Sequence, residues 1–174
     1  IRAKSDFDGD AVIIKGSGKK SNYSATAGWI RGGIIDGGKQ LLTGIRAEGS
    51  ERLEIADLVV SNALYKGIHI CKGGYEKNLT RVRCDVDLNT KCAPGSIGIH
   101  YESGDSKVNL AHVIGYETGV RSDRYSCWFN LVHVWNYDAK QGPMLYNFYC
   151  NGTADTYFNC YTDSPTTAGF YITK

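Results

Sequence analysis

One short motif returns along the chain at intervals of roughly 20 to 30 residues. Each copy has a glycine, then an apolar residue, then a polar or aromatic residue, then an uncharged residue. The copies lie at residues 42–48, 65–70, 96–102, 118–123 and 168–172. A period in this range is typical of solenoids, and the alternation of residue types within each copy has the period of a strand rather than a helix. We therefore expect each repeat to contain short β-strands.

A second set of segments lies between the copies of the glycine motif. They are residues 53–60, 79–86, 108–113 and 129–134. In three of them, two apolar residues are spaced two apart and the next apolar residue follows after three. This break in the alternation predicts corners at residues 56–57, 111–112 and 132–133. A strand, a corner, a second strand and then the glycine strand form one coil. We predict an all-β chain, folded as a right-handed single-stranded parallel β-helix of about six to seven coils.

The composition fits one solenoid domain and argues against several classes of protein. With 174 residues and a formal net charge of +2, the chain has the length of one domain, and its charge does not favour nucleic acid. No apolar run reaches the length of a membrane span, so we expect no membrane insertion. Both ends fall inside repeats without a capping repeat, so residues 1–174 are expected to be one segment of a longer β-helix.

The cysteines do not follow a metal-binding or disulfide pattern. They are Cys71, Cys84, Cys92, Cys127, Cys150 and Cys160. Their spacing contains no C-x-x-C pair, so zinc is not expected. Cys84 occupies the position that Leu58, Val113 and Val134 hold in other coils, which predicts an inward side chain. We expect free buried thiols rather than a disulfide framework, and neither a metal nor a cofactor.

Residues 33–37, with the sequence Gly-Ile-Ile-Asp-Gly, carry a family resemblance. In coils of this period the string is similar to the early coils of the pectate-lyase-like superfamily. With its 12 tyrosines, the chain most resembles the tailspike depolymerases of bacteriophages. The resemblance implies a homotrimer on the virion tail that binds and cleaves a bacterial surface polysaccharide. The Asn-Thr-Asp motif of polygalacturonases is broken here at Lys91, and the aspartate clusters of calcium-dependent pectate lyases are missing.

Equivalent residues in successive coils of a parallel β-helix lie about 4.8 Å apart and form columns. We place a further copy of the motif at residues 144–148, with Leu145 where the other copies have glycine. The apolar residue after the glycine points inward, so the next residue and the one two further on point outward. The first outward column is predicted to contain Arg46, His69, His100, Arg121, Asn147 and Tyr171. The second is predicted to contain Glu48, Cys71, Glu102, Asp123, Tyr149 and Thr173.

These two columns predict a face that binds and cleaves a glycan. Glu102 and Asp123 fall one coil apart, a separation suited to the paired carboxylates of glycoside hydrolases, so we predict them to be the catalytic acid and the base or nucleophile. Their mutual repulsion is expected to raise the pKa of one of them. The predicted substrate-binding residues are Arg46, His69, His100, Arg121, Tyr146, Tyr149 and Tyr171.

Other interpretations of the same residues stay open. Outward columns are polar in any β-helix, so Glu102 and Asp123 also fit ordinary cross-strand ion pairs. The face would equally serve a non-catalytic adhesin or a structural tail appendage that binds glycan without cleaving it. A polysaccharide lyase would instead abstract a proton through Arg121, His100 or a tyrosine.

Histidine and tryptophan residues also lie near the predicted corners of the second set of segments. His112 and His133 follow Asn-Leu pairs at equivalent positions, and we interpret them as structural corner residues. Trp128 flanks one of these corners, where it would pack against a neighbouring chain or stack on sugar rings. The sequence does not separate these two roles.

Overall fold

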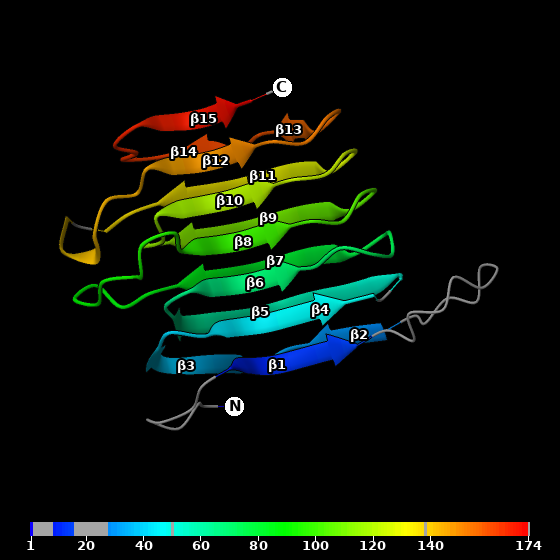
Figure 1. The fold of residues 1–174 in the computed structure, drawn as a ribbon, viewed down its shortest axis with the longest axis horizontal. Coiled ribbons are helices and arrows are strands. Elements are labelled where there is room, and N and C mark those ends of the chain that lie inside the picture. The colour runs from blue at the N-terminus through cyan, green and yellow to red at the C-terminus, as the bar shows by residue number, and fades with distance from the viewer. Residues whose placement is uncertain (2–8, 16–27, 50, 138, 174) are drawn as a thin grey trace.

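Successive turns of parallel strands stack into a solenoid (Figure 1). The computed structural model describes residues 1, 9–15, 28–49, 51–137 and 139–173. The chain winds as a right-handed coil of about six turns, which confirms the predicted parallel β-helix. The described residues form no α-helix, and their helical segment is the 3₁₀ turn η1 (Ala139–Gln141). Within this part of the chain, no helix is long and apolar enough to cross a membrane.

The strands form two parallel sheets, which we call the front sheet and the rear sheet after their places in Figure 1. The front sheet contains β1 (Asp10–Lys15), β4 (Thr43–Glu48), β6 (Lys66–Ile70), β8 (Ile97–Tyr101), β10 (Thr118–Ser122), β12 (Tyr146–Cys150) and β15 (Ala168–Ile172). The path of the rear sheet contains β2 (Gly28–Arg31), β5 (Leu53–Ala63), β7 (Asn78–Asp85), β9 (Lys107–Ile114), β11 (Trp128–Trp135) and β13 (Thr156–Phe158). Off this path, β3 (Ile34–Gln40) pairs with β5 and β14 (Tyr161–Thr162) pairs with β11. One turn therefore contributes one rung to each sheet.

Apolar columns fill the space between the two sheets. In the front sheet, the buried residues Ile45, Ile68, Ile99, Val120 and Phe148 lie on consecutive rungs. In the rear sheet, Val60, Cys84, Val113 and Val134 do the same, with no exposed surface. Cys84 is thus an inward core residue as predicted, and all six cysteines are free, five of them buried. Each turn completes its core only by packing on its neighbours.

The close approach of the two sheets requires the repeated glycine. A Cβ atom built on Gly98 would lie 2.1 Å from Cγ1 of Val113 and 2.8 Å from the carbonyl oxygen of Gly119. A Cβ atom on Gly119 would lie 2.1 Å from Cγ1 of Val134. These separations are far inside van der Waals contact, so even the smallest side chain would push the front strand away from the rear sheet.

The copy of the motif near residues 144–148 starts two residues later than we predicted. The pairing of β10 with β12 places Asn147, not Leu145, opposite Gly119. The side chain of Asn147 is fully buried, and its Nδ2 donates to the carbonyl oxygen of Val134 at 2.8 Å. A polar side chain therefore fills the glycine position because it binds rear-sheet backbone, an arrangement that a search for glycine does not find.

Single residues with positive φ make the corners of the rear strands. They are Asp57, Arg81, Leu110 and Leu131, with φ of 56°, 51°, 56° and 54°. The corner predicted at 56–57 is confirmed, whereas those predicted at 111–112 and 132–133 were wrong by about one residue. Leu110 and Leu131 are 42 % and 44 % exposed, so counting these leucines as core positions displaced the predicted corners.

His112 and His133 lie beyond the corners rather than at them. They occupy neighbouring rungs of β9 and β11, with ring centroids 5.7 Å apart. The ring of Tyr161 continues the row, 4.6 Å from His133. Because these rings pack on one another across neighbouring strands of the rear sheet, we retain a structural role for them.

Gly98→Ala tests the close approach of the sheets. The added methyl group meets Val113 and backbone, so we expect the free energy of unfolding to fall by at least about 2 kcal/mol in urea titrations. Gly28→Ala is the matched control, because its Cβ would meet only Cδ1 of Leu53 at 3.5 Å, an ordinary contact. Equal stability of the two variants would contradict the role assigned to the glycine.

Candidate functional site

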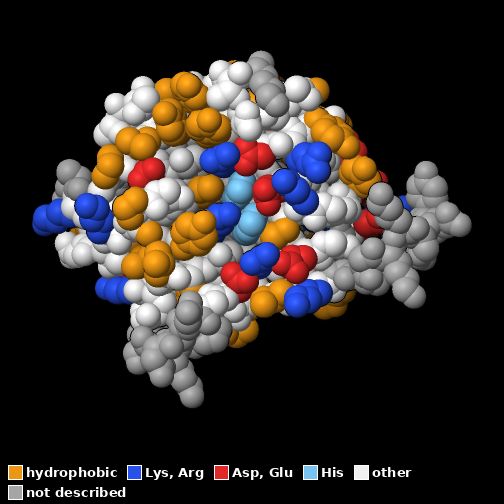
Figure 2. Space-filling view, viewed as in Figure 1, with side chains coloured by type: hydrophobic (Ala, Val, Ile, Leu, Met, Phe, Trp, Pro, Cys, Tyr) orange, Lys and Arg blue, Asp and Glu red, His pale blue; other side chains and the backbone are white. Residues whose placement is uncertain are grey.

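Two outward columns of polar and aromatic side chains run along the front sheet. The first contains Arg46, His69, His100, Arg121, Tyr149 and Tyr171 on consecutive rungs. The second contains Glu48 at the end of β4, followed by Cys71, Glu102, Asp123, Asn151 and Thr173, whose backbone amides continue the ladder after their strands end. Figure 2 shows the histidines at the centre of this face, among carboxylate and basic side chains.

The predicted columns are correct in their first four rungs and wrong in the fifth. Because the motif copy shifts by two residues, Tyr149 replaces Asn147 in the first column. Asn151 replaces Tyr149 in the second. The shift places Tyr149 directly beside Arg121, whose guanidinium lies 5.0 Å from the centre of the tyrosine ring.

Two carboxylates of the second column, those of Glu102 and Asp123, reach back to the histidine of the preceding turn. Glu102 Oε2 lies 2.9 Å from Nε2 of His69, and Asp123 Oδ2 lies 2.7 Å from Nε2 of His100. The two imidazole rings stack, with centroids 4.7 Å apart and planes 3° from parallel. This separation is the rung spacing itself, so the parallel ladder fixes the stack.

Lys66 belongs to this site, and the sequence analysis missed it. Its Nζ lies 3.0 Å from Nδ1 of His100, and only 9 % of the residue is exposed. A protonated lysine only donates, so Nδ1 of His100 accepts and its Nε2–H donates to Asp123. The available signal was Lys66 itself, immediately before Gly67, where the later motif copies have uncharged residues.

Among the described carboxylates of the front sheet, Asp123 accepts the most side-chain hydrogen bonds. In addition to His100, it accepts from Nε of Arg121 at 2.8 Å and from Nδ2 of Asn151 at 3.1 Å. Burial opposes ionisation of Asp123, but these donors outweigh it and hold its pKa well below the usual range. Asp123 is therefore ionised at neutral pH.

Glu102 also has a lowered pKa, so the expectation that repulsion raises the pKa of one carboxyl was wrong. Burial opposes its ionisation, but the hydrogen bond from His69 and the nearby His100 outweigh burial. Each carboxylate has its own imidazole donor, and these donors offset the repulsion between Glu102 and Asp123. Conversely, burial and the neighbouring Lys66 and His100 lower the pKa of His69 to about 4.

The three predicted tyrosines form one cluster at the end of the first column. Ring centroids are 5.3 Å apart for Tyr146 and Tyr149, 4.9 Å for Tyr146 and Tyr171, and 5.2 Å for Tyr149 and Tyr171. Tyr171 is 41 % exposed, and Tyr146 and Tyr149 are half-buried. The cluster therefore presents ring surface beside Arg121.

A hollow of about 310 Å³ opens at the other end of the column. Arg46, Tyr65, Lys66 and His69 line it, together with Asp10 and residues 41–43. Burial lowers the pKa of Lys66, an effect that the carboxylate of Glu102 only partly offsets. The hollow thus combines basic groups with one aromatic ring, a composition suited to an acidic substituent on a sugar.

His69, His100 and Glu102 are the described residues that come nearest to a metal site. One ligand atom from each lies within 4.8 Å of the others. Two nitrogens bound to one zinc ion are at most about 4.2 Å apart, and their in-plane lone pairs must converge on it. The parallel rings of His69 and His100 direct their lone pairs side by side instead. As placed, these residues do not fit a metal ion.

The lowered pKa of His69 makes stability depend on pH. The unfolded chain takes up this proton near pH 6.5 and the folded chain near about 4, so folding is favoured above pH 6.5 and this contribution is lost as the pH falls toward 4. In urea titrations, the free energy of unfolding should fall by up to about 3 kcal/mol over this interval. His69→Gln should flatten this part of the curve.

His112→Gln is the matched control, because it removes an exposed histidine from the rear sheet. If the ion pair with Glu102 dominated instead, wild-type stability would rise rather than fall between pH 6.5 and 4, and the assigned cause would be wrong.

Comparison with known proteins does not assign the chain to a family. No protein-family model, no curated protein and no solved structure matches the chain. Because one fold hosts many functions, the solenoid alone does not assign an activity. The function has to be argued from the front-sheet columns.

Proposed function

We propose that the front sheet binds a polysaccharide of the bacterial surface and that the protein cleaves it by glycoside hydrolysis. The main support is the continuous outward column of guanidinium, imidazole and tyrosine groups from Arg46 to Tyr171, with carboxylates along one side. A linear polymer lying along the solenoid axis would meet one rung about every 4.8 Å.

The two ends of the column suit different parts of a glycan. The rings of Tyr149 and Tyr171 offer platforms for sugar faces, and Arg121 lies beside them. The hollow lined by Arg46 and Lys66 suits a carboxylate or another acidic substituent. We infer an acidic polysaccharide that lies across several turns.

The hydrogen bonds suggest different roles for the two carboxylates. Asp123 accepts from three side chains and stays ionised, as a nucleophile or general base must. Glu102 accepts from His69, and we assign it the role of general acid. Because its pKa is lowered, the protonated form is scarce at neutral pH, and hydrolysis should be fastest under acidic conditions.

The environment of Lys66 supports a second candidate, cleavage by β-elimination. Burial lowers the pKa of its amine, which increases the neutral fraction able to take a proton from the carbon next to a uronate carboxylate. Arg121 would bind that carboxylate, and His100 lies 3.0 Å from the amine. This reaction gives an unsaturated product, which distinguishes it from hydrolysis.

The assembly and location remain part of the proposal. The resemblance of residues 33–37 supports a homotrimeric tailspike on a phage virion. An adhesin or structural tail appendage would use the same face to hold polysaccharide without cleaving it.

Glu102→Gln and Asp123→Asn test the hydrolase. We expect the wild type to release reducing ends from at least one of a panel of purified capsular and O-antigen polysaccharides, faster at acidic than at neutral pH. Each variant should lower the rate by about 10²-fold or more, because each removes one proton-transfer or nucleophilic group. Glu117→Gln is the matched control, since Glu117 accepts from the amide of Gly95 and lies outside both columns.

The same assay separates the alternatives. Full activity in both variants would move the chemistry away from Glu102 and Asp123. Ultraviolet absorbance from unsaturated ends, lost in Lys66→Met, would replace hydrolysis with elimination. Binding without either signal across the panel would leave an adhesive face and overturn the enzyme proposal.

A further inference from the structure

The outward face of the rear sheet carries its own pair of columns, separate from the front-sheet site. The first contains Trp29, Glu54, Asn78, Lys107, Trp128 and Thr156 on consecutive rungs. The second contains Arg31, Ala56, Thr80, Asn109, Asn130 and Phe158. Both columns lie on the part of the rear strands that precedes the positive-φ corner residues.

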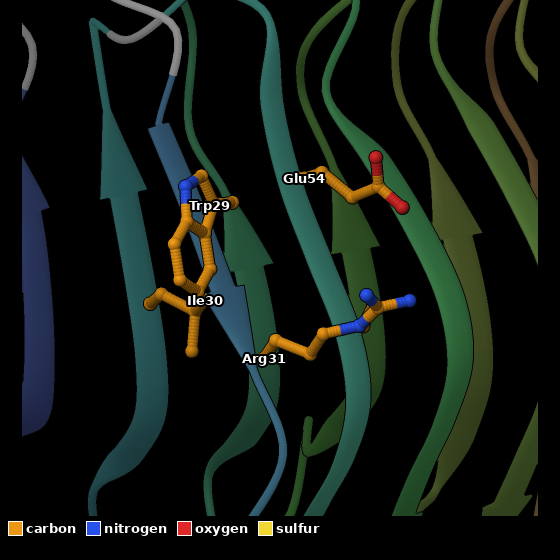
Figure 3. Close-up of a pocket in the computed structure, with 5 residues that line it drawn as sticks. Trp29, Ile30, Arg31 and Glu54 are labelled. Atoms are coloured by element: carbon orange, nitrogen blue, oxygen red, sulfur yellow. The ribbon is translucent and has the colours of Figure 1, made fainter.

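Three neighbouring hollows with shared lining residues lie along these columns, and we call them together the trough. The first, of about 420 Å³, lies between Trp29, Arg31 and Glu54 (Figure 3). The second, of about 360 Å³, shares Glu54 with the first and extends to Trp128. The third, of about 440 Å³, shares Lys107 and Trp128 with the second. The first two hollows thus follow the solenoid axis across the strands, and the third lies beside the second, where the same rear strands begin.

A tryptophan stands at one end of the trough, and a second lies where its last two hollows meet. Trp29 is 78 % exposed and Trp128 is 53 % exposed. Four rung spacings separate them, which corresponds to about 19 Å. The ammonium group of Lys107 lies 4.7 Å from the centre of the Trp128 ring, which helps to hold that indole in place. Exposed indoles at this spacing offer two flat apolar platforms to one elongated ligand.

Hydrogen-bonding groups line the floor between the tryptophans. The side-chain oxygen of Asn78 accepts from the Lys107 amide at 3.2 Å, and that of Asn109 accepts from Nδ2 of Asn130 at 2.8 Å. Within the part of the chain that the structure describes, no group accepts from the side-chain NH₂ of Asn78 or of Asn109. Thr80 lies two residues after Asn78 on β7 and is paired with Asn109 on β9. An apolar partner that excluded water from the trough would leave these amide groups without hydrogen bonds, which costs free energy. Sugar hydroxyls can both donate to and accept from such groups.

Charges in the trough are mixed and partly paired. Arg31 is bound to Asp57 at 2.9 Å, and Glu76, two residues before Asn78, is bound to Arg52 at 3.1 Å. The remaining charged side chains of its lining are those of Glu54, Asp105 and Lys107. The trough therefore has no excess of basic groups to attract a polyanion, in contrast to the hollow of the front sheet.

We propose that this trough is a second binding site, which holds a linear uncharged glycan along the rear sheet. Sugar rings stack on Trp29 and Trp128, and ring hydroxyls accept from the amides of Asn78 and Asn109. The proposal does not depend on cleavage at the front sheet, because it uses none of the front-sheet residues.

Tryptophan fluorescence tests the proposal directly. In a Trp135→Phe background, Trp29 and Trp128 are the two remaining tryptophans of the chain. Defined neutral linear glycans of increasing length, with α and β linkages, should shift this emission. Affinity should rise with length until a glycan spans both indoles. Charged oligouronates should bind more weakly than neutral glycans of equal length.

Trp29→Ala and Trp128→Ala should each weaken binding about tenfold, the usual cost of losing a central aromatic contact. Calorimetry with the best neutral glycan measures this loss. Asn109→Ala provides a second, less disruptive variant. Tyr161→Ala is the matched control, because it removes a ring of the rear sheet that lies beyond the corner and is about as exposed as Trp128, and it should bind normally.

Three outcomes would overturn the proposal. One is that no neutral glycan in the panel binds. Another is that binding is unchanged when Trp29 and Trp128 are both replaced. The third is that this double variant alters the association state in sedimentation, which would make the trough an interface between copies of the chain.

Discussion

Hydrogen bonding between successive parallel turns determines the chemistry of this protein. The ladder places equivalent residues about 4.8 Å apart, so any side chain repeated in sequence becomes a stack in space. His69 and His100 lie face to face at 4.7 Å for this reason, and the Asn109–Asn130 amide pair on the rear sheet has the same origin. Sites on such a fold are columns rather than pockets enclosed by loops.

The ladder requires a thin, regular core. Gly98 and Gly119 allow the front strands to approach Val113 and Val134 within distances that exclude a side chain. In β12, Asn147 takes the glycine position and its side chain bonds to rear-sheet backbone, and in the first strand, β1, Ala11 lies opposite Gly44. At Asn147, a new hydrogen bond to the rear sheet therefore compensates for the loss of the glycine.

Electrostatics divides the outer surface into two faces of different character. On the front sheet, hydrogen-bond donors from the same and neighbouring turns hold Glu102 and Asp123 ionised, and burial keeps His69 neutral. Charge, burial and hydrogen bonding are thus coupled along one column, so a change at one rung alters the next. On the rear sheet, Trp128 and the asparagines present an exposed surface with few unpaired charges.

The sequence alone determined the solenoid, the inward columns and the rungs of Arg46, His69, His100 and Arg121, because strand periodicity and a repeated glycine are local patterns. It did not determine the register of Asn147, the corners at Leu110 and Leu131, or the bond from Lys66 to His100. These features depend on which atoms meet across turns and sheets. Leucine also occupies exposed corners, and asparagine replaces glycine where backbone accepts its amide, so only the tertiary structure decided them.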